Sequence, residues 1–144
     1  GRKTAVMSAV PAGPAAELYQ HDAADERLRS GHVVMLTGGT GNPFFSTDTA
    51  AALRAAELGA EAILKATKVD GVYDADPVSN PDASRFSELT YEEVLERRLG
   101  VMDMTAVSLA RDRGLPIIVF SLFGDGAIAK AVRGEKIGTL VKEG

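Results

Sequence analysis

The sequence of 144 residues contains no cysteine, which excludes disulfide bonds and metal sites built on thiolates. It also lacks long apolar runs: none approaches the roughly 20 residues needed to span a bilayer, and no signal-peptide pattern opens the chain. Positive charge is scarce, since the formal net charge is -4 and the pI is near 5.2. General nucleic-acid binding is not expected, because phosphate neutralisation needs a basic surface. These absences predict a soluble, cytoplasmic protein, and they leave room for a single bound nucleotide.

The remaining composition is that of an ordinary globular protein, with 45% apolar and 25% charged residues, and the length suits one domain over residues 1–144. Strand and helix patterns alternate, which predicts an α/β sandwich with a mostly parallel sheet. The expected strands are Thr4–Val10, His32–Thr37, Glu61–Ala66, 115–122 and an edge strand over 138–142. The expected helices are Pro14–Ser30, Thr47–Leu58, Asp103–Arg113, 126–134 and one that follows a capping box of Thr90 and Glu93.

The first expected strand follows the start of the sequence almost directly, with no element before it. A parallel sheet normally carries helices on both faces. We therefore expect the chain to begin within its fold, with an N-terminal part lacking.

A glycine-rich loop, "TGGTGNPFFSTD" over residues 37–48, joins an expected strand to an expected helix. Ligands of parallel sheets bind at this end of the strands, where a helix N-terminus favours a phosphate or carboxylate. Hydroxyls of Ser46, Thr47 and Thr49 can bind such a group, whereas Asp48 would need a cation or lysine partner. An alternative is purely structural, with Thr47 as N-cap and Asp48 as a favourable first-turn charge. The adjacent phenylalanines fit either the core or the border of a planar base.

A second polar segment, "KATKVDGVYDADP" over residues 65–77, also follows an expected strand. Its three aspartates suggest a metal loop, but they do not have the EF-hand order, and we predict no protein-bound metal. A hairpin with solvated carboxylates is the alternative reading of this pattern. The lysines that flank Thr67 are positioned to pair with phosphates, although exposed lysines usually have no such role.

Taken together, the two segments and the motifs "LTYEEVL", "VMDMTA", "LPIIVF" and "GEKIGTLV" closely resemble the C-terminal portion of bacterial UMP kinases, in the amino acid kinase superfamily. The resemblance runs in order through residues 32–142 and more loosely through 1–31. The element "VDGVYDADP" is shared with aspartokinase-like relatives, while "GTGNPFF" points to UMP kinases. The implied fold is the three-layer amino acid kinase sandwich.

The resemblance implies phosphoryl transfer from MgATP to UMP, which gives UDP and ADP, with Mg²⁺ supplied together with ATP. It implies catalytic roles for Asp48 and Asp103 and contacts between ATP and Thr67, Tyr73 and Asp76. It also implies a homohexamer with GTP and UTP as effectors. The residues that it assigns to UMP are Thr40, Gly41, Asn42, Pro43, Phe44, Phe45, Ser46 and Thr47.

The sequence departs from the family in lacking the N-terminal phosphate loop with its lysine and a further glycine-rich loop that contacts UMP. We therefore expect the isolated chain to be inactive. Two alternatives remain: a related kinase with another acceptor, and a nucleotide-binding or storage protein that does not phosphorylate UMP.

Overall fold

The computed structural model describes all residues 1–144 and contains seven strands, five α-helices and one short 3-10 helix. The α/β class predicted from the sequence is confirmed. In chain order the elements are β1 (Thr4–Ser8), η1 (Gly13–Ala15), β2 (Glu17–Leu18), α1 (His21–Arg29), β3 (Val33–Thr37), α2 (Thr47–Glu57), β4 (Ile63–Thr67), β5 (Glu88–Thr90), α3 (Tyr91–Glu96), α4 (Met104–Asp112), β6 (Ile117–Ser121), α5 (Ala127–Val132) and β7 (Thr139–Lys142).

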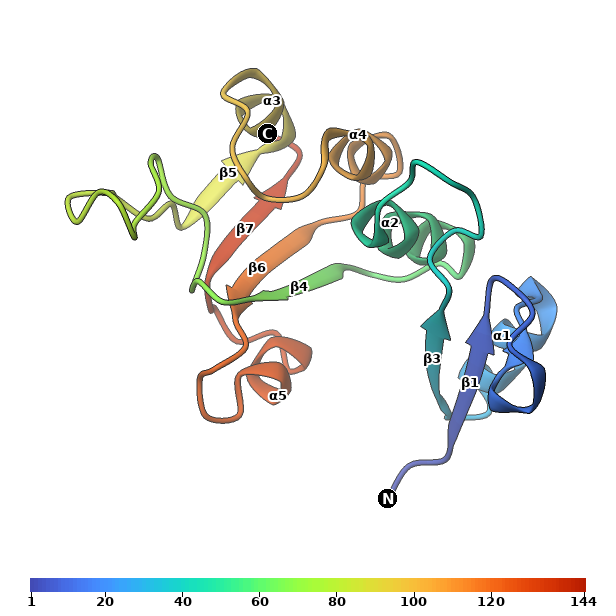
Figure 1. Cartoon of the computed structure of the whole chain (residues 1–144). Helices are drawn as coiled ribbons and strands as arrows, with labels where there is room; N and C mark the ends of the chain where they lie inside the picture. The colour runs from blue at the N-terminus through green and yellow to red at the C-terminus, as the bar shows by residue number, and fades with distance from the viewer.

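The strands form two separately hydrogen-bonded sheets (Figure 1). The smaller sheet has the order β2-β1-β3 and is entirely parallel. The larger sheet has the order β4-β6-β7-β5, in which only the β6–β7 pair is antiparallel. The chain passes from the smaller sheet to the larger one through the glycine-rich loop and α2.

Helices lie on both faces of the larger sheet (Figure 1). Helices α2, α3 and α4 lie on one face, where α4 packs against both of the others, and α5 lies on the opposite face. This arrangement gives the helix–sheet–helix layers expected of the fold. The first turn of α2 thereby comes to lie over the larger sheet, next to α4.

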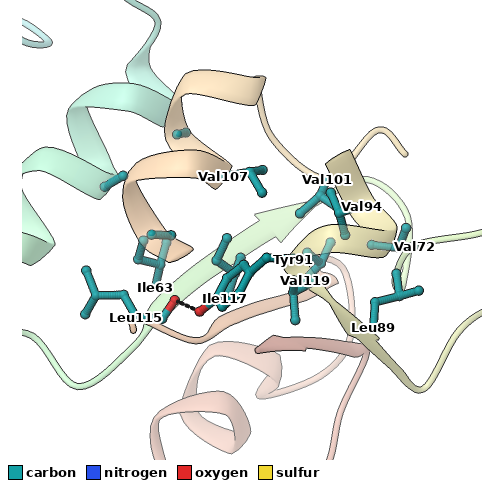
Figure 2. Close-up of a cluster of buried hydrophobic side chains, with 14 residues drawn as sticks. Ile63, Val72, Leu89, Tyr91, Val94, Val101, Val107, Leu115, Ile117 and Val119 are labelled. Atoms are coloured by element: carbon teal, nitrogen blue, oxygen red, sulfur yellow. Dashed lines mark hydrogen bonds between the residues drawn. The ribbon is translucent and has the colours of Figure 1, made fainter. Parts of the chain in front are cut away.

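The main core consists of 14 buried residues between the larger sheet and α2, α3 and α4 (Figure 2). Tyr91 is its largest fully buried member, and its hydroxyl donates a hydrogen bond of 2.5 Å to the carbonyl oxygen of Leu115. A buried hydroxyl without such a partner would cost free energy, so this bond permits the whole ring to lie in the core.

The expected helix over Pro14–Ser30 is wrong in its first half. Only α1 is α-helical there, while Glu17–Leu18 pairs with β1 as strand β2. The alanine-rich composition favoured a helix, but the open edge of β1 offers backbone hydrogen bonds that outweigh this local preference.

The expected edge strand over 138–142 is also wrong in its position. Strand β7 lies inside the larger sheet, between β6 and the three-residue strand β5, which was too short to be recognised in the sequence. The close approach of β7 to β6 depends on Gly138, where φ is +67° and an added Cβ would lie 1.9 Å from the Val119 carbonyl oxygen.

The predicted capping box is confirmed, since Thr90 and Glu93 each accept a hydrogen bond from the other's backbone N–H.

Candidate functional site

The glycine-rich loop leaves the carboxyl end of β3 and folds back against the end of β1. Gly38 has a φ of +76°, and an added Cβ there would lie 2.9 Å from the Ser8 Oγ and 3.2 Å from the Ala9 nitrogen. A side chain at Gly38 is excluded both by this conformation and by the lack of space. The loop backbone is therefore held close to the end of the smaller sheet.

The tip of the loop is a polar turn that ends in two exposed rings. The Thr40 Oγ1 accepts a hydrogen bond of 3.1 Å from the Asn42 N–H, and the Asn42 amide donates to the Thr40 carbonyl. Phe44 has a left-handed backbone, with φ of +70°, and its side chain is fully exposed. Phe45 is 54% exposed. The two rings are therefore not part of the core.

Helix α2 begins at the end of this loop, and its N-cap is Ser46. The Ser46 Oγ accepts a hydrogen bond of 3.0 Å from the Thr49 N–H, which corrects the alternative that made Thr47 the cap. Thr47 instead lines a cavity of about 300 Å³ between the loop and α2, together with Leu36, Thr37, Gly38, Gly39, Ala50, Ala51 and Arg54. Backbone N–H groups and the positive end of the helix dipole at this place suit an anionic group.

Asp48, in the first turn of α2, forms an ion pair with Lys65 of strand β4. The two side chains are 24% and 28% exposed, so the pair is largely shielded from solvent. The sequence predicted that Asp48 needs a cation partner, and the structure identifies that partner as Lys65. The signal in the sequence was the alternation of β4, which turns residues 63, 65 and 67 to the face that packs under α2.

Asp103 joins the N-termini of two helices. It caps α4 by accepting a hydrogen bond of 3.0 Å from the Ala106 N–H. It also accepts hydrogen bonds from the hydroxyls of Ser46 and Thr49, at the start of α2. Burial would raise the pKa of Asp103, but these hydrogen bonds outweigh it and hold the pKa below its usual value. Asp103 is therefore an anion that fixes the end of the glycine-rich loop.

The predicted ATP residues lie in the segment after β4, where Tyr73 and Arg85 form an isolated antiparallel bridge. Tyr73 and Asp76 line a hollow of about 350 Å³ together with Val69, Gly71, Val72, Asp74, Ala75, Pro77, Arg97, Arg98, Leu99 and Gly100. The Asp76 carboxylate accepts hydrogen bonds from the Val78 N–H and the Ser79 hydroxyl, and these bonds lower its pKa.

Thr67 is not brought into this hollow. It ends β4 beside Ser121 of β6, and its hydroxyl accepts from the Val69 N–H and donates to the Val69 carbonyl. A polar cavity of about 330 Å³ begins at Ser121 and includes Lys130 and Lys136. It also includes Asp70, whose pKa is lowered by a hydrogen bond from Tyr73 and by the Arg85 guanidinium.

Two further properties of the whole chain bear on the site. No group of three or more histidine, aspartate or glutamate side chains is arranged to hold a metal ion. None of the helices is both long enough and apolar enough to cross a membrane.

Comparisons with known proteins all point to the same family. The sequence model of the amino acid kinase family matches residues 5–121. A uridylate kinase of Magnetococcus marinus is 53% identical over 143 residues, which are 99% of this chain and 59% of that relative. A uridylate kinase of Alcanivorax borkumensis is 52% identical over 140 residues, which are 97% of this chain and 56% of that relative. The chain thus spans little more than half the length of these curated relatives.

Solved structures support the same conclusion. A UMP kinase from Bacillus anthracis superposes with a TM-score of 0.94 at 37% identity and covers 99% of this chain, which corresponds to 59% of that structure. A UMP kinase from Ureaplasma parvum superposes with a TM-score of 0.91 at 33% identity, over 99% of this chain and 61% of that structure. The resemblance found in the sequence motifs is therefore confirmed, and so is the fold that it implied.

Proposed function

Because the chain belongs to the amino acid kinase family, we propose that the whole protein transfers the γ-phosphate of MgATP to UMP. Residues 1–144 then form the C-terminal, nucleotide-binding portion of a single amino acid kinase-like domain. The observation that carries the proposal is the start of α2, where the N-terminus of a helix, exposed rings and the Asp48–Lys65 ion pair meet.

In this proposal the loop Thr40–Thr47 binds the acceptor. The N-terminus of the 11-residue helix α2 attracts the phosphate of UMP, and the hydroxyl of Thr47 is near enough to that end to donate to it, whereas the one hydroxyl proton of Ser46 is donated to Asp103. The exposed ring of Phe44 offers a flat apolar surface for the uracil base. Asp103 acts as a positioning residue, because it holds the Ser46 hydroxyl.

The donor nucleotide binds at the ends of β4 and β6 and along the segment that follows β4. Thr67, Tyr73 and Asp76 contact ATP, with Tyr73 and Asp76 in their common hollow. The nearby arginines of that hollow, Arg97 and Arg98, supply positive charge. The Mg²⁺ ion arrives as part of the substrate MgATP, and the protein needs no metal site of its own for this reaction.

The chemistry requires little more than positioning and charge neutralisation. An oxygen of the UMP phosphate attacks the γ-phosphorus of ATP, the bond from that phosphorus to the β,γ-bridging oxygen breaks, and ADP leaves. The attacking oxygen is already anionic, so no strong base has to remove a proton. Negative charge spreads over the transferred group and requires ordered cations. One of these cations is the ammonium group of Lys65, which Asp48 holds in place.

The proposal extends to the properties of the assembled enzyme. We expect a cytoplasmic homohexamer that responds to GTP and UTP, as the family resemblance implies. We also expect the isolated 144-residue chain not to turn over.

The decisive experiment incubates the full-length protein with MgATP and a set of acceptors: UMP, CMP and a carboxylate such as N-acetylglutamate. The expected result is ADP formation matched by UDP, with UMP as the preferred acceptor. Transfer to a different acceptor would assign the protein to another kinase of the family. Binding of ATP without transfer to any acceptor would support a storage protein instead.

Asp48→Asn in the full-length protein tests the role of the ion pair. The substitution keeps the shape and the first-turn position but removes the charge, so kcat should fall by ~100-fold or more. The affinity for UMP should stay within a few-fold, because a repulsion between anions disappears. Asp22→Asn is a matched control, since Asp22 is also the second residue of a helix and is fully exposed. Normal kcat with much weaker UMP binding would show that Asp48 only shapes the loop.

A further inference from the structure

The C-terminal end of α2 contacts an aromatic ring from the smaller sheet. Tyr19 directly follows β2, and its backbone N–H donates a hydrogen bond of 2.8 Å to the carbonyl oxygen of Ser8, the last residue of β1. The Tyr19 ring lies against the guanidinium of Arg54 in α2, with 3.8 Å between the guanidinium carbon and the ring centre. This contact joins the smaller sheet to a helix that packs on the larger one.

A carboxylate closes this contact from a third side. The Glu57 Oε2 accepts a hydrogen bond of 2.6 Å from the Arg54 guanidinium and one of 2.9 Å from the Tyr19 hydroxyl. The Arg54 side chain is 13% exposed, and a guanidinium–ring contact is stronger where solvent is excluded. We call Tyr19, Arg54 and Glu57 the latch. His21, the first residue of α1, adds a second tie, since its Nε2 lies 3.0 Å from the Glu57 carbonyl oxygen.

The same helix is joined to the smaller sheet at its other end by the glycine-rich loop. Gly38, Gly39 and Gly41 of this loop have positive φ. Glycines give a loop more backbone freedom than other residues do, so this connection alone would let α2 and the smaller sheet move relative to each other. The latch is a second connection between the same two parts. Together the two connections restrain the loop at both of its ends.

The latch also borders the cavity between the glycine-rich loop and α2. Arg54 follows Thr47 by about two turns on the same face of the helix, and both residues line this cavity together with Gly38 and Gly39. Tyr19 is not among the residues that line it. Arg54 therefore connects the cavity wall beside the loop to a ring that lies outside the cavity.

We propose that Tyr19 and Arg54 are positioning residues for the acceptor, because through the latch they hold the glycine-rich loop in the conformation that binds UMP. The inference rests on the proposed function and adds residues that act on the loop from the far end of α2. The residues proposed to bind ATP lie on other segments, after β4. Loss of the latch should therefore weaken the binding of UMP and leave the binding of ATP unchanged.

Equilibrium binding of UMP and ATP to the full-length protein tests this in Tyr19→Leu and Arg54→Met, which remove the two stacked groups. We expect the affinity for UMP to fall by ~10-fold in each variant, with an unchanged affinity for ATP and a kcat at saturating UMP within a few-fold of the wild type. The double variant should lose no more than either single variant, because both substitutions break the same contact. Arg54→Lys keeps the charge and should recover part of the affinity.

Arg29→Met is the matched control. Arg29 also lies in the last turn of a helix and pairs with a carboxylate of its own helix, Asp25. Its substitution should leave both affinities unchanged.

Three results would overturn the proposal. Weaker UMP binding in Arg54→Met without any change in Tyr19→Leu would mean that Arg54 binds UMP directly from the cavity wall. Equal losses of UMP and ATP affinity would mean that the latch only stabilises the fold. Unchanged UMP affinity in both variants would mean that the latch does not act on the loop. If either variant does not fold, Tyr19→Phe and Arg54→Gln replace them, with the same pattern expected and a smaller loss for Tyr19→Phe, which removes only the hydroxyl.

Amide hydrogen exchange separates this proposal from the proposed function. The amides of residues 38–46 should exchange faster in Tyr19→Leu and Arg54→Met than in the wild type and in Arg29→Met, whichever acceptor the protein uses. A wild-type protein that forms no UDP would refute the proposed acceptor, while this comparison would still decide whether the latch holds the loop. Formation of UDP by the wild type, with unchanged exchange and unchanged UMP affinity in the two variants, would refute the latch alone.

Discussion

Phe44 combines a left-handed backbone with complete exposure of a large apolar ring. A left-handed conformation costs a residue with a side chain roughly 1–2 kcal/mol. Because the ring is exposed, no free energy of hydrophobic burial offsets this cost. Strain of this kind is found where function maintains it. In the proposed site the ring would be covered only when UMP is bound.

Phe44→Gly tests whether this strain serves binding. The unfolding free energy of the chain should rise by up to about 1 kcal/mol, because relief of the strain exceeds the added flexibility of glycine in the unfolded state. The affinity of the full-length protein for UMP should fall by ~10-fold through loss of base stacking. Urea unfolding and equilibrium binding measure the two effects. Phe45→Gly is the control, since Phe45 has no positive φ to relieve, and a less stable Phe44→Gly would contradict the argument.

At the residue level, local contacts were predictable and distant ones were not. The capping box of Thr90 and Glu93 spans three residues, so its geometry follows from the helix itself. The partner of Asp48 is 17 residues away on another element, and it depends on how α2 packs over β4. The sequence could therefore predict that Asp48 has a cation partner, but it could not identify that partner as Lys65. It indicated Lys65 only as a lysine able to bind phosphate.

Helices α2 and α4 are joined at their N-termini by one carboxylate, that of Asp103. The sequence placed Asp103 at the start of the expected helix Asp103–Arg113, a position where aspartate is a favoured N-cap. It did not indicate the hydroxyls of Ser46 and Thr49, which are more than 50 residues away. The ends of elements near caps could thus be predicted from the sequence. The contacts between elements could not, because they depend on how the core packs.

Asp103→Asn separates the cap from the link between the helices. Asparagine caps a helix about as well as aspartate, so α4 should keep its N-terminus. The hydroxyls of Ser46 and Thr49 lose an anionic acceptor, and we expect the unfolding free energy to fall by about 1–2 kcal/mol. Urea unfolding of the chain measures this loss. Unchanged stability together with lost turnover in the full-length protein would mean instead that Asp103 acts directly on the nucleotides.

The whole molecule should lose stability on acidification. Glu57, Asp70, Asp76 and Asp103 all have a pKa below the usual value, and the hydrogen bonds that these carboxylates accept lower it. A group with a lowered folded-state pKa adds stability above its unfolded pKa, near 4, and that stability is lost as the pH falls through the folded value.

Urea unfolding of the chain between pH 7 and pH 3 should therefore show an unfolding free energy that declines below about pH 4. The decline should be shallower in Asp103→Asn, which has no carboxyl to protonate at that position. A decline of equal steepness in both proteins would show that the pKa of Asp103 is not lowered by folding.

The distribution of the core has a consequence for cooperativity. All 14 residues of the main core lie between Ala52 and Val141, and the smaller sheet contributes none of them. Its strands are joined to the rest by the glycine-rich loop and α2, without a hydrogen bond to the larger sheet. Elements with few buried apolar contacts open at lower free energy than the global transition. Amide hydrogen exchange of the chain should therefore be faster in β1 and β3 than in β6 and β7, so that the smaller sheet opens while the larger one stays folded.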